Sequence, residues 1–298
     1  MNAEPPPLPK TTTGERLALL SCIHGNMAAL EAVWDDLQAR KVDRVICLGD
    51  LVGYGPWPRE VIAFIQKHNI ATVRGCWDEG IGLDRADCGC KFVTAEDAEW
   101  GHEVFDWTKR ALKPAEMKFL ADLEFARGEQ LAKAGRVAFV HGSPRNSSEY
   151  LMESTHELVL FERVASAGAD VLVCGHTHVP FVRQMKGTLR VTAEVGMKDA
   201  IQREELGLAP REVPRDITLA PKIIINAGSV GEPRHGTPHA TYVIFNTATL
   251  DVGIHAVPYD VEKTARDILR RGLPRVFADR LRAGSELAVK NKDIVCAC

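Results

Sequence analysis

Four histidines and one aspartate of this chain stand directly after short apolar runs. They are His24, Asp50, His141, His176 and His178. One histidine at the end of a strand is usually a structural residue with satisfied hydrogen bonds, but packing does not readily explain five such positions. Imidazole and carboxylate groups are natural ligands of borderline first-row metals. The residue types and their placement therefore predict a metal site.

The end of a buried strand would position each of these residues. The apolar runs that read as strands cover residues 17–23, 44–48, 71–73, 136–140 and 171–174. Amphipathic stretches at 27–40 and from Pro58 onward separate the first three runs. This alternation predicts a parallel sheet covered by helices, and ligands of such sheets gather beyond the carboxyl ends of the strands. Three consecutive strand ends would thus carry His24, Asp50 and the segment 75–78 to one rim.

Five short segments contain these residues in a fixed order. They are Cys22-Ile23-His24-Gly25-Asn26, Gly49-Asp50-Leu51-Val52-Gly53-Tyr54-Gly55-Pro56, Arg74-Gly75-Cys76-Trp77-Asp78, His141-Gly142-Ser143 and Gly175-His176-Thr177-His178. The segments resemble the ordered motifs D-x-H, G-D-x-x-G, G-N-H-[DE], H-G and G-H-x-H of calcineurin-like metallophosphoesterases. A lone G-H-x-H would be a weak signal, whereas five motifs in order across about residues 16–245 are a specific one.

The resemblance implies an α/β fold of four layers, in which two mixed β-sheets lie between helices, and a dinuclear metal centre. Asp50 would bridge the two ions. His24 and His178 would bind one ion, and His141 and His176 the other. Two divalent or trivalent cations would lower the pKa of bound water and offset charge on phosphoryl oxygens. The implied reaction is metal-dependent hydrolysis of phosphoester bonds by a hydroxide that bridges the metals.

Further residues are candidates for contacts with the phosphate group. Asn26 and the backbone near Gly142 would help to orient it. Arg145 and Arg234 would clamp it, because a guanidinium forks onto phosphate oxygens. The segment 226–231 resembles the one that follows G-H-x-H in bacterial members, although a tight turn enabled by glycine explains this segment equally well.

Three residues depart from the family pattern. Cys22 replaces the aspartate of D-x-H, Cys76 replaces the asparagine of G-N-H-[DE], and Trp77 replaces the histidine beside it. Both cysteines stand at ligand positions, and thiolates favour zinc or iron, with manganese also compatible with the site. Without the histidine, good leaving groups are favoured, because their departure needs less protonation. We therefore expect phosphodiesters or activated phosphomonoesters as substrates.

Other interpretations of the two cysteines remain open. Cys22, at the end of a buried strand, would be stable there as a small hydrophobic residue, and Cys76 is expected in a loop. If both line one small site, they could form a disulfide and expel metal, although a reducing cytosol opposes this. A centre without two of its usual ligands could also bind one ion or none. The alternative function is a catalytically weakened protein that senses metal or redox state.

The remaining cysteines suggest one further site. Cys47 and Cys174 lie in apolar runs and are expected in the core. The doublets Cys88/Cys90 and Cys296/Cys298 would form a four-cysteine zinc site if they met, but nothing in the sequence brings them together. Eight cysteines in 298 residues do not indicate a secreted disulfide framework.

Composition and charge exclude several classes of protein. The net charge of −3 and the pI of about 6.4 leave no basic footprint for nucleic acid as the main partner. No apolar run approaches the ~20 residues of a membrane span, and the N-terminus lacks the apolar segment of a signal peptide. We therefore expect a cytoplasmic enzyme that acts on phosphorylated small molecules or nucleotides, with its oligomeric state open.

One large domain is expected. The predicted boundaries are residues 1–14 for a disordered tail, 15–285 for the metallophosphoesterase domain and 286–298 for a C-terminal tail. The charged, proline-containing segment 194–222 is interpreted as an insertion. A hairpin with strands at 181–185 and 189–193 is expected before it, and residues 79–94 are expected to be a loop.

Overall fold

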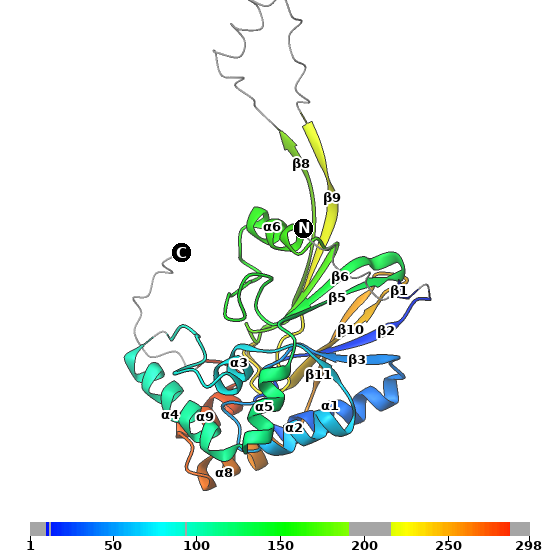
Figure 1. The fold of residues 1–298 in the computed structure, drawn as a ribbon. Helices are drawn as coiled ribbons and strands as arrows, with labels where there is room; N and C mark the ends of the chain where they lie inside the picture. Colours follow the sequence, from blue (N-terminus) through cyan, green and yellow to red (C-terminus); the bar gives the residue numbers. More distant parts are fainter. Residues whose placement is uncertain (1–9, 12, 93, 191–215, 287–298) are drawn as a thin grey trace, which may run out of the picture.

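The computed structural model describes residues 10–11, 13–92, 94–190 and 216–286 (Figure 1). The strands are β1 (Lys10–Thr11), β2 (Arg16–Leu20), β3 (Arg44–Cys47), β4 (Ala71–Thr72), β5 (Ala126–Leu131), β6 (Gly135–Val140), β7 (Val171–Cys174), β8 (Phe181–Arg190), β9 (Asp216–Asn226), β10 (Ala240–Asn246) and β11 (Val252–Val257). The helices are α1 (Met27–Arg40), α2 (Pro58–Lys67), α3 (Cys76–Gly82), α4 (Ala95–Ala111), α5 (Pro114–Asp122), η1 (Ala132–Ala134), α6 (Glu157–Ser166), α8 (Val261–Arg270) and α9 (Arg275–Ala283). None of the helices in these ranges combines the length and apolar character needed to cross a bilayer.

The strands form two mixed sheets. The five-stranded sheet has the order β11-β10-β2-β3-β4, and the six-stranded sheet has the order β1-β5-β6-β7-β9-β8. β2, β3 and β4 run parallel, as the alternation of strands and helices predicts. β6, β7 and β9 run parallel in the other sheet, where β1 and β5 form a second parallel pair. Each sheet also contains antiparallel pairs, such as β10 with β2 and β5 with β6.

Alternate residues of the central strands face different cores. Leu17 on β2 and Val137 on β6 pack in the core between the two sheets. Their neighbours Ala18 and Ala138 face outward, Ala18 into the core that includes α1 and α2 and Ala138 into the core under α6. Because side chains alternate along a strand, each sheet can bury both faces. The predicted order of helix, sheet, sheet and helix is thus confirmed (Figure 1).

The region after β7 differs from its prediction. β8 continues to Arg190 and pairs with β9, with an irregularity in register between Met185 and Gly187. The expected turn there is wrong, because the backbone bulges and continues instead of reversing. Of the expected insertion at 194–222, residues 216–222 belong to β9, and the remainder lies outside the described residues.

The region after β4 also differs. Cys76 is the first residue of α3, so the expectation that it lies in a loop is wrong, and so is the assignment of Glu79–Gly82 to a loop. The carboxylate of Asp78 accepts the N–H of Gly75 at 3.0 Å, which satisfies a donor at the start of the helix. The sequence signal was weak because α3 spans only Cys76–Gly82 and contains two glycines.

The carboxyl ends of β2, β3 and β7 carry an unusual concentration of strained backbone. Five non-glycine residues there have positive φ, namely Cys22 (52°), His24 (49°), Asp50 (56°), His176 (65°) and His178 (60°). This conformation costs about 1–3 kcal/mol for each residue and persists only where the surrounding structure requires it. All five are predicted metal ligands.

Candidate metal centre

Two groups of buried donor atoms lie at these strand ends. The Cys22 group consists of Cys22, His24 and His178, and the Asp50 group consists of Asp50, Cys76, His141 and His176. Within each group, the donor atoms all lie within 4.8 Å of one another. This spacing suits ligands of one ion at metal–ligand distances of about 2.0–2.3 Å. The structure therefore brings together all seven residues that the sequence suggested as metal ligands.

Asp50 lies between the two groups, because one of its carboxylate oxygens is near a histidine of each. Its Oδ2 is 3.1 Å from His141 Nε2 and 3.6 Å from His24 Nε2. Its Oδ1 accepts the N–H of Trp77 at 2.9 Å, which orients the carboxylate. Although burial disfavours its charge, the neighbouring imidazoles, with His141 foremost, hold the pKa of Asp50 well below its usual range. One oxygen of an ionised carboxylate thus faces histidines of both groups.

The two histidines of the Cys22 group face each other through their Nε2 atoms, neither of which carries a proton. His24 Nδ1 lies 3.0 Å from the carbonyl of Val52, and His178 Nδ1 lies 2.6 Å from that of Glu232. These carbonyls assign the ring proton to Nδ1 and leave a lone pair on each Nε2. The two Nε2 atoms are 3.0 Å apart, and burial lowers the pKa of His24 to about 4. A cation between them removes the repulsion, so the residues fit a metal ion.

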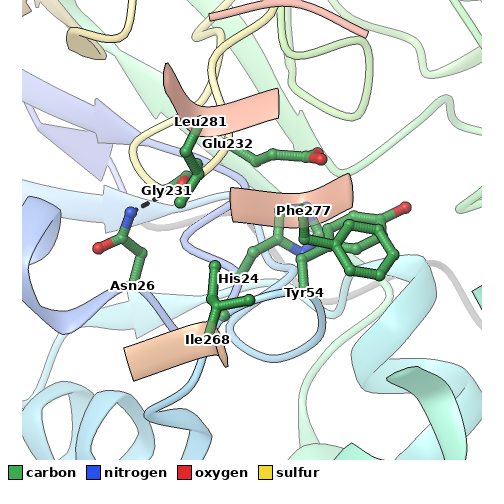
Figure 2. Close-up of a pocket in the computed structure, with 9 residues that line it drawn as sticks. His24, Asn26, Tyr54, Gly231, Glu232, Ile268, Phe277 and Leu281 are labelled. Carbon is green, nitrogen blue, oxygen red and sulfur yellow. Dashed lines mark hydrogen bonds between the residues drawn. The ribbon is translucent and has the colours of Figure 1, made fainter. Parts of the chain in front are cut away.

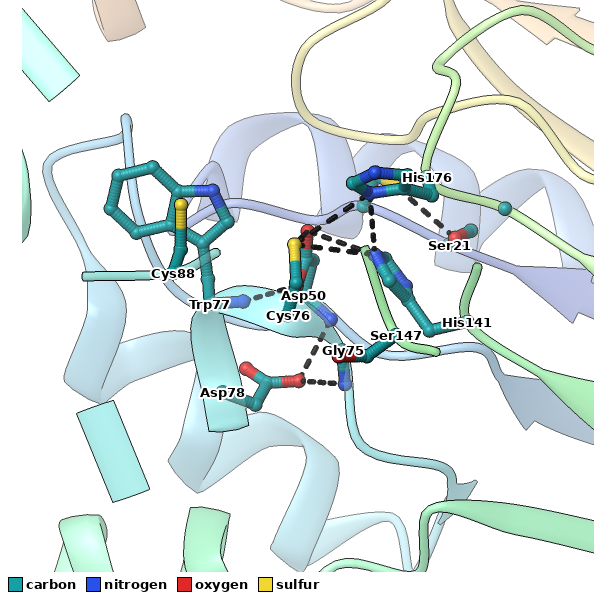
Figure 3. Close-up of polar contacts among 12 residues, drawn as sticks. Ser21, Asp50, Gly75, Cys76, Trp77, Asp78, Cys88, His141, Ser147 and His176 are labelled. Atoms are coloured by element: carbon teal, nitrogen blue, oxygen red, sulfur yellow. Dashed lines mark hydrogen bonds and ion pairs between the residues drawn. The ribbon is translucent and has the colours of Figure 1, made fainter. Parts of the chain in front are cut away.

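The Asp50 group combines oxygen, sulfur and nitrogen donors. His141 Nδ1 lies 2.7 Å from the carbonyl of Leu48, so its Nε2 lone pair faces inward, 3.2 Å from His176 Nδ1. Cys76 Sγ lies 3.4 Å from Asp50 Oδ2 and 3.6 Å from His176 Nδ1. Figure 3 shows these side chains converging on one point. A donor set with imidazoles and a thiol suits zinc or iron better than magnesium.

The two thiols belong to different groups. Burial raises the pKa of both Cys22 and Cys76 well above the usual value for a thiol. A bound metal ion would stabilise each thiolate, because coordination requires deprotonation. Both cysteines are free thiols. The sulfur that lies beside Cys76 Sγ is that of Cys90, at a distance of 3.2 Å. The disulfide between Cys22 and Cys76 considered from the sequence is therefore not formed.

Two buried carboxylates position the donors, although the sequence had suggested no role for them. Asp78 accepts the N–H groups of Asp50 at 2.7 Å and Leu51 at 2.9 Å. Glu232 Oε2 lies 3.0 Å from His178 Nδ1 and accepts from Arg234 at 2.7 Å. The place of Asp78 in the 74–78 segment was a signal for the first carboxylate. For Glu232, the sequence contains no motif that indicates its contact with His178.

Asn26 is engaged by the protein itself. Its Oδ1 accepts the N–H of Ala29 and so caps α1, and its Nδ2 donates to the carbonyl of Gly231 at 2.9 Å. A small pocket adjoins it, lined in part by His24 and Phe277 (Figure 2). These bonds hold the loop that carries His24 against the loop at Gly231.

The two candidate arginines have different surroundings. Arg145 is more than half exposed and pairs with Glu162. Arg234 is largely buried, and it pairs with Glu232 at 2.7 Å and with Glu286. Its Nε atom is buried and has no hydrogen-bond partner among the described residues. Only Arg234, of the two, belongs to the immediate surroundings of the donor groups.

The segment 226–231 is a turn that contacts both the loop of Cys22 and His24 and the loop of His176 and His178. Asn226 Nδ2 donates to the carbonyl of Gly175 at 2.8 Å, and Ser229 Oγ donates to that of Cys22 at 2.8 Å. Gly228 has a φ of +73°, which a tight turn favours. The turn thus fixes the backbone on both sides of the Cys22 group.

Trp77 fills the interior beside the metal centre. It is 1 % exposed, and its ring packs on Tyr54 at 4.7 Å and meets His24 edge-on at 6.3 Å. Trp57 is also buried, at 8 %. Neither indole offers an exposed face on which a base could stack, so both serve in packing.

Known proteins resemble this chain over most of its length. The model of the calcineurin-like phosphoesterase superfamily domain matches residues 16–205. An uncharacterised protein of Methanocaldococcus jannaschii is 32 % identical over 271 residues, which cover 90 % of this chain and 98 % of that protein. Relatives of solved structure extend the comparison.

A crystal structure of a metallophosphoesterase from Sphaerobacter thermophilus is 29 % identical and has a TM-score of 0.65, with 91 % of this chain and 100 % of that one covered. A hypothetical protein from Pyrococcus horikoshii shares the fold, with 20 % identity, a TM-score of 0.67, and coverage of 91 % of this chain and 99 % of that chain. The matched domain contains both donor groups, and the observed four layers agree with it. The chain therefore belongs to the calcineurin-like phosphoesterase superfamily, a family of metal-dependent phosphoester hydrolases.

Proposed function

We propose that this protein hydrolyses phosphodiesters or activated phosphomonoesters at a two-metal centre that has one thiolate ligand for each ion. The observation that carries the proposal is the position of Asp50 Oδ2, 3.1 Å from His141 Nε2 and 3.6 Å from His24 Nε2. A carboxylate oxygen shared between two sets of imidazole lone pairs suits a pair of cations. When bound, two such ions activate water and offset charge on the phosphoryl oxygens.

The residues of this chain would bind and orient the substrate around that centre. Arg234 is the proposed phosphate contact, because its buried Nε has no partner among the described residues and a guanidinium pairs well with phosphate oxygens. Its ion pair with Glu286 would have to open for this contact. Asn26 would act as a positioning residue, because its polar atoms are bonded to the protein.

The proposed preference for good leaving groups follows from Trp77. Its indole occupies the position of the family histidine and is buried against Tyr54. An indole N–H does not titrate near neutral pH, so this side chain cannot protonate a departing alkoxide. Esters of acidic alcohols, and phosphoric anhydrides, have leaving groups that depart without being protonated.

The thiols also support a proposal for the metal identity and the cellular location. A thiolate in each group favours zinc or iron, with manganese a third candidate. The cysteines Cys22, Cys47, Cys76, Cys88, Cys90 and Cys174 are free. Reduced thiols suit a reducing compartment, and we therefore propose a cytoplasmic enzyme.

The test combines metal analysis with turnover. Protein purified without oxygen should contain close to two ions of zinc or iron per chain, and it should hydrolyse bis(4-nitrophenyl) phosphate or 4-nitrophenyl phosphate. Removal of a metal ligand costs several kcal/mol of transition-state stabilisation, so His141→Ala should lower kcat/KM by about 10³-fold. His102→Ala, at an exposed position of α4, is the matched control and should be active. Tight metal binding without turnover would instead support the alternative function, a protein that senses metal or redox state.

A further inference from the structure

Three cysteines meet at the outer side of the Asp50 group. The chain leaves α3, passes through the exposed residues Leu83–Asp87 and returns with Cys88 and Cys90. Cys90 Sγ comes to 3.2 Å from Cys76 Sγ. Cys88 is 6 % exposed and lies in the same buried cluster as Cys76. The metal centre thus has free thiols beside its own sulfur ligand.

The distance between Cys76 and Cys90 suits bond formation. A disulfide needs about 2.05 Å between the sulfur atoms, so the two must approach by about 1 Å. Cys76 is held by α3, but Cys90 follows the exposed residue Gly89, which has a φ of +71° and where an added Cβ would meet only Ser148, at 3.5 Å. The loop that carries Cys90 can therefore supply the movement without disturbing the sheets.

The two thiols also differ in their access to solvent. Cys76 is 1 % exposed, whereas Cys90 is half-buried. A small oxidant therefore reaches Cys90 first. Because Cys76 Sγ lies beside it, an oxidised Cys90 would react with this neighbour before a second oxidation.

We propose that Cys76 and Cys90 are a site of reversible disulfide formation that withdraws the sulfur ligand from the Asp50 group. Hydrogen peroxide would oxidise Cys90 to a sulfenic acid with release of one water. The Cys76 sulfur would then attack the Cys90 sulfur, and the second water would leave. In sum, two thiols and one peroxide give one disulfide and two waters, and a cellular dithiol reverses the reaction by exchange.

Metal loss would follow from the same step. A disulfide sulfur is a poor ligand, so the Asp50 group would retain Asp50, His141 and His176 only. The Cys22 group shares no thiol with this pair and should keep its ion. The disulfide itself needs only the geometry of the thiols, whereas its effect on metal rests on the proposed two-metal centre.

The experiment is an oxidation with one equivalent of hydrogen peroxide, on protein with and without metal. Free thiols are then alkylated, peptides are mapped by mass spectrometry, and released metal is measured with a chromogenic chelator. In wild-type protein we expect a peptide cross-link between Cys76 and Cys90 that dithiothreitol removes, and release of one ion per chain. Cys90→Ser should abolish both results, with Cys90→Ala as a second variant in case serine impairs folding.

Cys88→Ser is the matched control, because it removes a thiol two residues away and should leave the cross-link intact. A cross-link between Cys88 and Cys90, a cross-link that includes Cys22, or no cross-link at all would overturn the proposal. A Cys76–Cys90 cross-link without metal release would overturn its effect on the metal centre. If this cross-link forms and releases metal in a protein that hydrolyses no phosphoester, the inference stands and the proposed function fails.

Discussion

The Cys22 group and the Asp50 group use similar ligands but are supported in different ways. Cys22 is enclosed by backbone, since its N–H donates to Gly49 at 2.9 Å and its carbonyl accepts from Gly231 at 2.9 Å. A Cβ added at Gly231 would lie 1.7 Å from the carbonyl of Ile23, so the strands and loops there are in close contact. The thiol of Cys22 consequently has one fixed place.

Cys76, by contrast, sits where the interior meets a loop. Its sulfur touches Asp50 on one side and Cys90 on the other, at 3.4 Å and 3.2 Å. The loop reaches Cys90 through exposed residues, so one partner of Cys76 can move while the other cannot. If both groups bind an ion as proposed, similar ligand types would give one fixed and one exchangeable half of the centre, because the support of a ligand decides how readily it leaves.

The largest effect should come from the residue that the two groups share. Asp50→Asn removes the charge between them, so both ions should bind more weakly and kcat/KM should fall by about 10³-fold or more. Metal content and hydrolysis of bis(4-nitrophenyl) phosphate measure this. Asp84→Asn, at a solvent-exposed aspartate, is the control. If the Asp50→Asn variant kept two tightly bound ions, Asp50 would not connect the groups.

Single thiol replacements should separate the groups. Cys22→Ser and Cys76→Ser each replace a soft ligand with a poor one, so each variant should retain one of two zinc or iron ions. Metal analysis after dialysis against a weak chelator would show the loss. Cys174→Ser, whose side chain packs in the core under α6 and not among the donor atoms, should keep both ions. Unchanged metal content and identity in both ligand variants would rule out thiolate coordination.

A smaller effect should appear when a supporting residue of the Cys22 group is changed. Glu232→Gln weakens the contact with His178 Nδ1, which is 3.0 Å long, and removes one of the two charge partners of Arg234. Outer partners of this type typically change metal affinity by about 10–100-fold. Competition with a chelator should show this loss at one ion only. An equal loss at both ions would mean that the groups are not independent.

The smallest effect on the centre should come from an ion-pair network at the far side of the sheets. Glu129 on β5 accepts from Arg44 on β3 at 2.8 Å. Burial disfavours its charge, but the hydrogen bonds and positive charges of Arg44 and Arg127 together outweigh this and lower the pKa of Glu129 below its usual value. Such a carboxylate stabilises the fold above the unfolded pKa, and this stability is lost as the pH falls through the lower folded pKa.

Glu129→Gln should therefore reduce the free energy of unfolding at neutral pH by about 1–3 kcal/mol, with metal content unchanged. Urea unfolding at neutral and at acidic pH measures the difference, which should shrink in acid as the wild-type carboxylate takes up its proton. A loss of metal from the Glu129→Gln variant would show that this ion-pair network and the metal centre are coupled.

Much of the centre was predictable because its ligands are local features of the sequence. His24, Asp50 and His176 each follow an apolar run, and strand ends of a parallel sheet necessarily meet at one edge. The same alternation predicted a parallel sheet covered by helices, since a strand that buries both faces needs cover on both sides. The four layers were expected only from the family resemblance. The histidine and aspartate types then limited the chemistry to metal binding.

The rest depended on the path of the chain in space. Cys88 and Cys90 had been considered with Cys296 and Cys298, which lie outside the described residues, yet the loop after α3 brings Cys90 to Cys76. Glu232 reaches His178 only because the 226–231 turn closes over the Cys22 group. Contacts of this kind join residues far apart in the chain, and no pattern of spacing encodes them. They arise when loops are packed against a finished pair of sheets.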